Sequence, residues 1–359
     1  MLASFDVSST SGSYKVTTRL GLWGDTLGQL AGHIVIADEY FASQASAGGA
    51  DVISLAAVES TKNLDRVPAI IEQLRRFGLS RDAKLLAIGG GIIQDITGFV
   101  ASIYMRGVAW SYFPTTLLGM ADSCIGGKSS INVGPYKNIV GTFHPPREIQ
   151  IDPSLTDTLS AEQKVAGLCE AAKICFCGGA ESFSKFCALR PTVHSDRNVL
   201  AQTIQISLAT KARFIETDEF DRGERLLLNF GHTFGHAIES ASHFRIGHGV
   251  AVGLGIIAAL NLSNRLGYLW LPDGRTETLK NLLEDLLSHV EGMSGLLGNI
   301  SLPDLMDAFG SDKKHNQQQF AVIIVSDDRV ERLLLARSTA NSAMIEYAFS
   351  NLLQQFAVH

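Results

Sequence analysis

Through its first 150 residues the chain alternates short apolar segments with longer segments of helical periodicity. The apolar segments lie at 33–37, 51–55, 84–88, 109–113 and 149–152. Between them, residues 63–79 place Val67, Ile70 and Leu74 at helical spacing, and residues 92–105 also read as a helix. Strands that alternate with helices predict a parallel, doubly wound sheet. We therefore expect an α/β, Rossmann-like nucleotide-binding domain over residues 1–155.

The pattern changes after residue 152. Ser160 and Gln163 form a capping-box pattern, which predicts a helix from there to residue 175. Further helices are predicted at about 195–217, 225–243 and 248–266, followed by strands at 320–325 and 332–336 and a last helix from about 340. We expect a mostly helical domain over residues 156–359, with the active site in a cleft between the two domains. The length of 359 residues suits two domains, at roughly 150 residues each.

Charge and composition exclude several classes of protein. The net charge is −6 and no run of basic residues occurs, which argues against a nucleic-acid partner. No apolar stretch is long enough to span a bilayer, and the N-terminus lacks the pattern of a secretory signal. The five cysteines include no CxxC pair, so we expect reduced thiols and a cytoplasmic protein.

Three consecutive glycines, Gly89 to Gly91, follow a predicted strand and precede a predicted helix. Glycines at such a turn let the backbone approach a ligand, and the free N–H groups of the helix start suit a pyrophosphate. The pattern is not GxGxxG, and the acidic residue that usually binds ribose cannot be assigned by spacing. Taken alone, the turn is equally compatible with a tight connection that binds nothing.

A second group of residues suggests a metal site. His232 and His236 are four residues apart and share one face of a predicted helix, and His248 follows twelve residues later. Glu170 stands in an apolar helical segment, where a carboxylate needs a partner. Two histidines and one glutamate with an open fourth position are typical of catalytic zinc. The spacing does not decide which two of the three histidines bind.

Several cations stand beside glycine, asparagine or apolar residues instead of in solvated charge runs. Lys173 is three residues from Glu170, so both side chains can face the same side of a helix. Cations in such surroundings favour an anionic ligand with more than one acidic group. The set comprises Lys128, Lys137, Lys173, Lys211, Arg225 and Lys313.

Taken in order, these motifs resemble the 3-dehydroquinate synthase family, within the sugar phosphate cyclase superfamily. The resemblance runs from about residue 30 to residue 325. It is carried by the glycine turn through Asp95 and by the segments 104–107, 114–118, 122–128, 137–138, 167–173, 228–239 and 248–252. One departure is Gln94, which stands where the family usually has glycine in the nucleotide turn.

The resemblance implies roles for particular residues. Glu170, His232 and His248 would bind Zn²⁺ or Co²⁺, while Lys211 and Arg225 would hold a substrate carboxylate. The implied catalytic residues are Lys128, Lys173, Lys211, Arg225, Asn229 and His236. The implied phosphate- and substrate-binding residues are Arg106, Asp122, Lys128, Lys137, Asn138, Lys211, Arg225, Asn229, His236 and Lys313 or Lys314. The residues that match the NAD⁺-binding region are Asp38, Glu59, Lys62, Gly90, Gly91, Asp95, Thr115, Thr116, Asp122 and Lys137.

The reaction implied by the resemblance converts a small anionic sugar phosphate into a carbocycle. One hydroxyl is oxidised transiently by NAD⁺, inorganic phosphate leaves, the carbonyl is reduced again, and an intramolecular aldol step closes the ring. The presence of both Lys211 and Arg225 favours a carboxylated heptulosonate phosphate. A homodimer is implied as well, with Arg106 reaching across its interface.

Other functions remain open from the sequence. A specialised cyclase that makes another cyclitol would share these motifs. A metal-dependent polyol dehydrogenase would share the two-domain plan and the glycine turn, but it has no need for so many anion-binding cations. A non-catalytic relative is disfavoured because the complete set of ligand residues is present.

Overall fold

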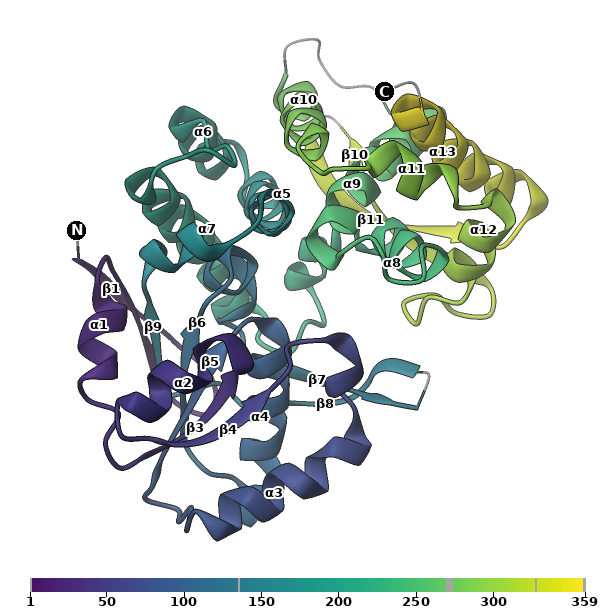
Figure 1. The fold of residues 1–359 in the computed structure, drawn as a ribbon. Helices are drawn as coiled ribbons and strands as arrows, with labels where there is room; N and C mark the ends of the chain where they lie inside the picture. Colours follow the sequence, from purple (N-terminus) through teal and green to yellow (C-terminus); the bar gives the residue numbers. More distant parts are fainter. Residues whose placement is uncertain (1, 135, 269–273, 327, 358–359) are drawn as a thin grey trace. The chain divides into compact units, whose positions relative to one another are not determined.

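The computed structural model describes residues 2–134, 136–268, 274–326 and 328–357. They form two compact units, each drawn in Figure 1. The first unit comprises residues 1–159 and 196–220, and the second comprises residues 160–195 and 221–359. The units differ from the predicted division at residue 155 chiefly in α7 (Arg197–Thr217), which groups with the first unit.

The first unit is built on a seven-stranded sheet in the order β1-β2-β9-β6-β5-β3-β4. All neighbouring strands from β2 to β4 in this order run parallel, and β1 pairs antiparallel with β2 at one edge. The predicted parallel α/β fold is thus confirmed, while the β1–β2 hairpin was not predicted. The strands are β1 (Leu2–Val7), β2 (Tyr14–Arg19), β3 (His33–Asp38), β4 (Asp51–Leu55), β5 (Lys84–Gly89), β6 (Trp110–Pro114) and β9 (Glu148–Ile151).

The central strands are buried because helices cover them. Residues 34–37 of β3 and 85–89 of β5 are buried without alternation, which is typical of parallel strands covered on both faces. Helix α2 packs against β3 and β4, and α4 packs against β5 and β6. The helices of this part are α1 (Leu22–Leu27), α2 (Glu39–Ala47), α3 (Val67–Arg76) and α4 (Gly91–Ile103).

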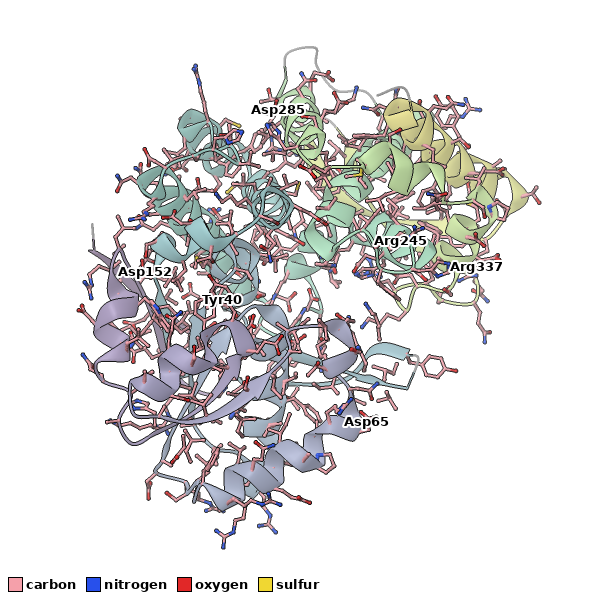
Figure 2. The ribbon with its side chains drawn as sticks, viewed as in Figure 1. Tyr40, Asp65, Asp152, Arg245, Asp285 and Arg337 are labelled. Carbon is pink, nitrogen blue, oxygen red and sulfur yellow. The ribbon has the colours of Figure 1, made fainter. Side chains whose placement is uncertain are left out.

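Asp152, labelled in Figure 2, follows strand β9 and connects it by hydrogen bonds to the start of helix α1. Its buried carboxylate accepts hydrogen bonds from the backbone N–H groups of Gly21 (3.2 Å), Trp23 (2.9 Å) and Ser154 (2.9 Å). It therefore satisfies helix-start donors of both α1 and the 3₁₀ helix η5 (Pro153–Thr158).

Shorter elements complete the first unit. The hairpin of β7 (Lys128–Val133) and β8 (Tyr136–Phe143) is antiparallel, with an irregularity between Ile131 and Val133. A π-helix, η4 (Gly119–Ser123), follows β6 and packs against α7. The 3₁₀ helices are η1 (Glu59–Thr61), η2 (Leu64–Arg66) and η3 (Tyr104–Arg106).

The second unit is mostly helical, as predicted. Its core is α9 (His248–Arg265), which is buried along almost its whole length and packs against α5, α8, α10 and α13. The capping box predicted at Ser160 and Gln163 opens α5. The other elements are α5 (Ala161–Cys177), α6 (Ala180–Leu189), η6 (Glu224–Asn229), α8 (His232–Ala241), α10 (Arg275–Ser288), α11 (Met293–Gly298), α12 (Leu302–Gly310), β10 (Gln319–Ser326), β11 (Arg329–Ala336) and α13 (Thr339–Ala357).

The prediction of one helix over residues 225–243 was wrong. The chain forms η6, turns at Gly231, and only then begins α8. Gly231 has a φ of 78°, and a Cβ there would lie 2.5 Å from a side-chain carbon of Ile256. The close packing of α8 on α9 thus excludes a side chain at Gly231, and the left-handed backbone of this residue interrupts the helix. Within the described residues, no helix is long and apolar enough to cross a membrane.

Candidate active site

Three predicted metal ligands meet in the second unit. Glu170 lies within α5, while His232 and His248 are the first residues of α8 and α9. The Nε2 atoms of His248 and His232 lie 3.4 and 3.7 Å from Oε1 of Glu170. The three candidate ligand atoms all lie within 4.8 Å of one another. The packing of α9 against both α5 and α8 brings them together.

The ligand types in this cluster, and a buried carboxylate oxygen without a hydrogen-bond partner, fit a cation site. Glu170 is fully buried, and its Oε2 atom accepts a hydrogen bond from Nζ of Lys173. Its Oε1 atom is buried and has no hydrogen-bond partner in the described part of the chain. A buried carboxylate oxygen without a partner is costly. Two imidazole nitrogens and a carboxylate oxygen are ligands that Zn²⁺ and Co²⁺ accept.

A second group, made of His236, Glu239 and His248, also has its candidate ligand atoms within 4.8 Å. Here, however, Oε2 of Glu239 already pairs with Nδ1 of His248 at 2.9 Å. Nδ1 of His236 likewise pairs with Oδ2 of Asp312 at 3.0 Å. Since these atoms have partners and Oε1 of Glu170 has none, the geometry favours the set of Glu170, His232 and His248.

The two histidines of that set differ in their electrostatics. Burial and the nearby charge of Lys173 hold the pKa of His232 well below its usual value, so this ring is neutral and its nitrogen is available to a cation. Burial also opposes charge on His248, but the carboxylates of Glu239 and Glu170 outweigh it and raise the pKa of His248 to about 10.

A charged group adjoins the cluster at His236. The Asp312 carboxylate is almost fully buried and lies 3.2 Å from Nζ of Lys314, which in turn lies 3.2 Å from Nδ1 of His236. Burial opposes the Asp312 charge, but its bonds to His236 and Lys314 outweigh this and lower its pKa. Of the two lysines left open by the sequence, Lys314 lies in this group, whereas Lys313 is exposed. Asp312 and Glu239 were not among the predicted site residues.

The nucleotide turn lies in the first unit, between β5 and α4. A Cβ at Gly89 would lie 2.5 Å from Ile93, and one at Gly90 would lie 2.9 Å from Cγ2 of Thr116. Packing therefore explains the first two glycines. At Gly91 the nearest atom to such a Cβ is Oγ of Ser123, at 3.9 Å, so packing does not require that glycine.

Several predicted nucleotide and substrate residues form one hydrogen-bonded network beside the turn. Nζ of Lys62 lies 3.0 Å from Oδ2 of Asp95 and 2.9 Å from Oδ1 of Asn138. Asp95 also accepts from the backbone N–H of Ser130 at 3.1 Å. Despite these bonds, burial raises the pKa of Asp95. Glu59 joins the network, with Oε1 at 3.7 Å from Nζ of Lys62. Ser130 was not predicted, because its role depends on a hairpin that the sequence did not reveal.

Lys137 reaches the same network through Glu59, since its Nζ lies 3.5 Å from Oε1 of that residue. Burial opposes the charge of Glu59, but Lys62, the amide of Asn132 and Lys137 outweigh it and lower the pKa of Glu59.

Lys211, which is buried, pairs with the half-buried Asp122 in the first unit. Nζ of Lys211 donates to Oδ1 of Asp122 at 2.5 Å and to its backbone oxygen at 2.7 Å. Lys211 lies on α7 and Asp122 on η4, so their pairing depends on the grouping of α7 with this unit. Arg225, the predicted partner of Lys211 at a substrate carboxylate, is buried on η6 of the second unit. That partnership stays a prediction.

The remaining predicted residues occupy varied positions. The Asp38 carboxylate accepts from the backbone N–H of Tyr40 at 3.1 Å and so caps α2. Thr115 is buried, and Oγ1 of Thr116 accepts from the N–H of Gly119 at 3.1 Å. Arg106 lies in an exposed turn with a φ of 66°. Nζ of Lys128 lies 5.9 Å from the centre of the Phe143 ring. Nδ2 of Asn229 donates a hydrogen bond to the backbone oxygen of Leu226.

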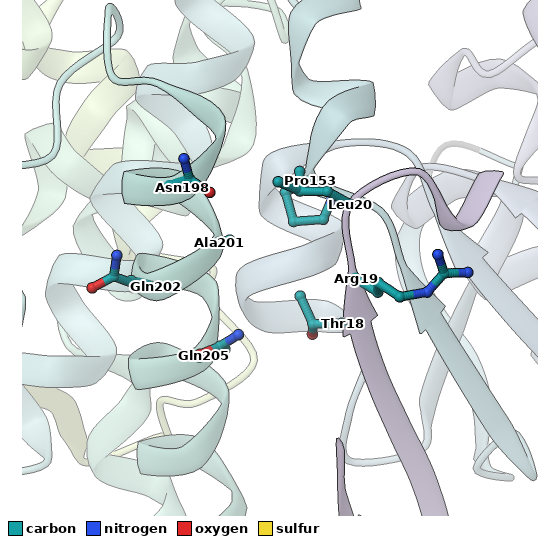
Figure 3. Close-up of a pocket in the computed structure, with 8 residues that line it drawn as sticks. All are labelled: Thr18, Arg19, Leu20, Pro153, Asn198, Ala201, Gln202 and Gln205. Atoms are coloured by element: carbon teal, nitrogen blue, oxygen red, sulfur yellow. The ribbon is translucent and has the colours of Figure 1, made fainter. Parts of the chain in front are cut away.

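A pocket of about 140 Å³ lies in the first unit, where β2, η5 and α7 meet (Figure 3). Thr18, Asn198, Gln202 and Gln205 contribute polar groups to it. None of the described residues that line it belongs to the predicted site. Its volume is also below the roughly 300–1,000 Å³ of typical small-molecule sites.

Models of known protein families match the segments that carry nearly all of these motifs. Residues 52–166 match the model of the 3-dehydroquinate synthase N-terminal domain, and residues 167–315 match that of the C-terminal domain. The chain belongs to the 3-dehydroquinate synthase family. The metal cluster, Lys211 and Arg225 all lie within the segment matched by the C-terminal model.

Individual members of the 3-dehydroquinate synthase family are similar to this chain. A 3-dehydroquinate synthase of Xylella fastidiosa strain M12 is 43% identical over 244 residues, which are 65% of this chain and 65% of that protein. Another, from strain 9a5c, is 38% identical over 311 residues, which are 80% of this chain and 76% of that protein.

Solved structures share the fold across the whole chain. A 2-deoxy-scyllo-inosose synthase, crystallised with carbaglucose-6-phosphate, NAD⁺ and Co²⁺, aligns with a TM-score of 0.83 at 20% identity, covering 97% of this chain and 99% of its own. The 2-epi-5-epi-valiolone synthase of Streptomyces hygroscopicus, with NAD⁺ and Zn²⁺ bound, aligns with a TM-score of 0.79 at 24% identity and the same coverage.

Proposed function

We propose that this chain is a sugar phosphate cyclase that converts DAHP, a carboxylated heptulosonate phosphate, into a carbocycle with loss of inorganic phosphate. The observation that carries the proposal is the convergence of His232 and His248 on the unpartnered Oε1 atom of Glu170. It occurs in a chain whose relatives, at 38% and 43% identity, bear the name 3-dehydroquinate synthase.

Two groups are expected to serve the reaction. Glu170, His232 and His248 would hold Zn²⁺ or Co²⁺, and the turn at Gly90 and Gly91 would hold NAD⁺ together with the predicted residues around it. When bound, they supply a positive charge beside the substrate oxygens and a reversible oxidation at one hydroxyl. The two solved structures of similar fold support this choice of cofactors, since they contain NAD⁺ with Co²⁺ or Zn²⁺.

The second unit provides a proton acceptor beside the metal cluster. The Asp312 carboxylate is the nearer of two charged neighbours of Nδ1 of His236, so we assign the imidazole proton to that nitrogen. Burial lowers the pKa of His236, which keeps the ring neutral. Nε2 of His236 is then the nitrogen that accepts a hydrogen bond or a proton from the substrate. Lys314, held beside it, contributes positive charge for a phosphate.

Recognition of the carboxylate is assigned to Lys211 and Arg225. Both carry buried positive charge, which binds a carboxylate strongly when it is within hydrogen-bond reach. Asp122 pairs with Lys211 and fixes the position of its ammonium group. A substrate carboxylate in reach of either cation would be held in the orientation that transfer steps require.

Phosphate release is the deciding measurement. With NAD⁺ and Zn²⁺ supplied, the protein should release inorganic phosphate from DAHP faster than from uncarboxylated heptulose or hexose phosphates. Release only from an uncarboxylated substrate would instead identify a specialised cyclase for another cyclitol. Steady NADH formation from glycerol-type polyols, without phosphate release, would identify a polyol dehydrogenase. The homodimer with Arg106 at its interface remains a prediction, as does the expectation that no nucleic acid or membrane is bound.

A further inference from the structure

Gln94 and Ser123 form a reciprocal pair of hydrogen bonds. Nε2 of Gln94 donates to the backbone oxygen of Ser123 at 2.7 Å, and Oγ of Ser123 donates to Oε1 of Gln94 at 2.7 Å. Gln94 is only 5% exposed, so both ends of its amide are committed to Ser123 in a place shielded from water. We propose that Gln94 and Ser123 are positioning residues, which fix the Asp122–Lys211 pair relative to the nucleotide turn.

One end of this link belongs to the turn. Gln94 lies in the first turn of α4, and its N–H donates to the oxygen of Gly90 at 3.0 Å. Its backbone therefore moves with the turn that the proposed function assigns to NAD⁺.

The other end belongs to η4. Ser123 is the last residue of this π-helix, and Asp122 directly precedes it. Oγ of Ser123 also lies 3.9 Å from the place where a Cβ on Gly91 would be. Single-turn π-helices are frequently found at functional sites. The two hydrogen bonds thus connect Ser123, the neighbour of Asp122, to the first turn of α4, which follows the nucleotide turn.

Helix α7 also contacts η4 and is bonded to it. Oγ of Ser207 donates to the oxygen of Ala121 at 2.8 Å, and Lys211 binds both the carboxylate and the backbone oxygen of Asp122. η4 is therefore held from α7 by these bonds and from α4 by Gln94. Without Gln94, the end of η4 keeps its bonds to α7 but loses this connection to the turn. Loss of this connection would displace the Asp122–Lys211 pair relative to the turn and so weaken the binding of NAD⁺ and substrate.

The inference rests on the proposed function and can be tested with two variants. Gln94→Met removes both hydrogen bonds at similar side-chain length, and Ser123→Ala removes only the one donated by Oγ. We expect Gln94→Met to raise the Kd for NAD⁺, measured by calorimetry without substrate, by about three- to tenfold, as the loss of two hydrogen bonds predicts. The KM for DAHP should rise as well, while kcat at saturation changes by less than about twofold because no reacting group is removed.

The double variant tests whether the two residues act together. If they form one link, the double variant should resemble Gln94→Met and fall short of the product of the single effects. Ser102→Ala is the matched control, because it removes the hydrogen bond from Oγ of Ser102 to the oxygen of Phe99 in the same helix, away from η4. It should leave the NAD⁺ Kd unchanged.

The outcomes separate this inference from the proposed function. If the wild-type protein neither binds NAD⁺ nor releases phosphate, the proposed function is wrong. If it does both, and Gln94→Met and Ser123→Ala keep wild-type Kd and KM values, the positioning role is overturned alone. The role is likewise overturned if both variants lower only the melting temperature, to the same extent as Ser102→Ala.

Discussion

Nδ1 of His248 lies 2.9 Å from Oε2 of Glu239, and the other nitrogen of the ring faces Glu170. A carboxylate in this position fixes the orientation of a metal-binding imidazole and increases its basicity. We predict that Glu239→Gln weakens Zn²⁺ or Co²⁺ binding by about 10- to 100-fold. Competition with a chelator measures this directly. The matched control is Glu181→Gln, which removes an exposed carboxylate that pairs with Lys185; an equal affinity in the two variants would contradict the role of Glu239.

Removal of a ligand should be more severe. His248→Ala leaves Glu170 and His232 as the only members of the favoured set, and two ligands hold Zn²⁺ poorly. Metal content after dialysis and phosphate release should both fall to background. The fold should survive, because the imidazole of His248 is 41% exposed and leaves no buried cavity. Full activity in the zinc-free variant would refute the metal role.

Asp312 should make stability depend on acid pH. Its pKa is lowered in the folded chain by its bonds to His236 and Lys314, which outweigh the opposing effect of burial. The resulting stabilisation is complete above the ordinary Asp value of 3.8 and is lost as the pH falls through the lowered pKa of the folded state. Urea unfolding with EDTA present should show a steeper loss of stability below about pH 4 for the wild type than for Asp312→Asn. The same pH dependence of stability in both proteins would contradict this role of Asp312.

Arg225 should decide between substrates. Arg225→Ala is expected to raise the KM for DAHP by at least about tenfold, since a charge-assisted hydrogen bond contributes about 1.5–3 kcal/mol. An uncarboxylated phosphate that the wild type accepts should be affected much less. The ratio of kcat/KM for the two substrates is the measurement, and an unchanged ratio would remove the assignment of Arg225 to the carboxylate.

Cys124, which is buried, and Cys177, which is half-buried, should be chemically inert in the native protein. Burial raises the pKa of Cys124 and of Cys177 to about 12, against partial compensation by nearby cations. Thiolates are the reactive species, so iodoacetamide should label neither residue at neutral pH until urea is added. Mass spectrometry of peptides after a timed exposure to iodoacetamide tests this. Rapid labelling of Cys124 in the native protein would contradict the prediction, because it would show that reagent reaches this residue without unfolding.

The class of fold and the three candidate metal ligands could both be predicted from the sequence, the ligands only through the family resemblance. Short apolar segments such as 84–88 alternate with segments of helical periodicity, and this order along the chain predicted a parallel sheet. The residues Glu170, His232 and His248 were named through the family motifs that contain them, and the structure brings them together. What spacing alone left open was which two histidines share Glu170.

The remaining features of the site could not be predicted, because they depend on contacts between residues that are far apart in the chain. Gly231 interrupts the predicted helix in a left-handed conformation, and the absence of a side chain there matters because Ile256, 25 positions later, lies against it. Glu239 and Asp312 gain their roles from partners on other elements, and Lys211 meets Asp122 only because α7 packs with the first unit. Gln94 is visible in the sequence as a departure from a glycine, but its bonds to Ser123 exist only once α4 and η4 are placed side by side.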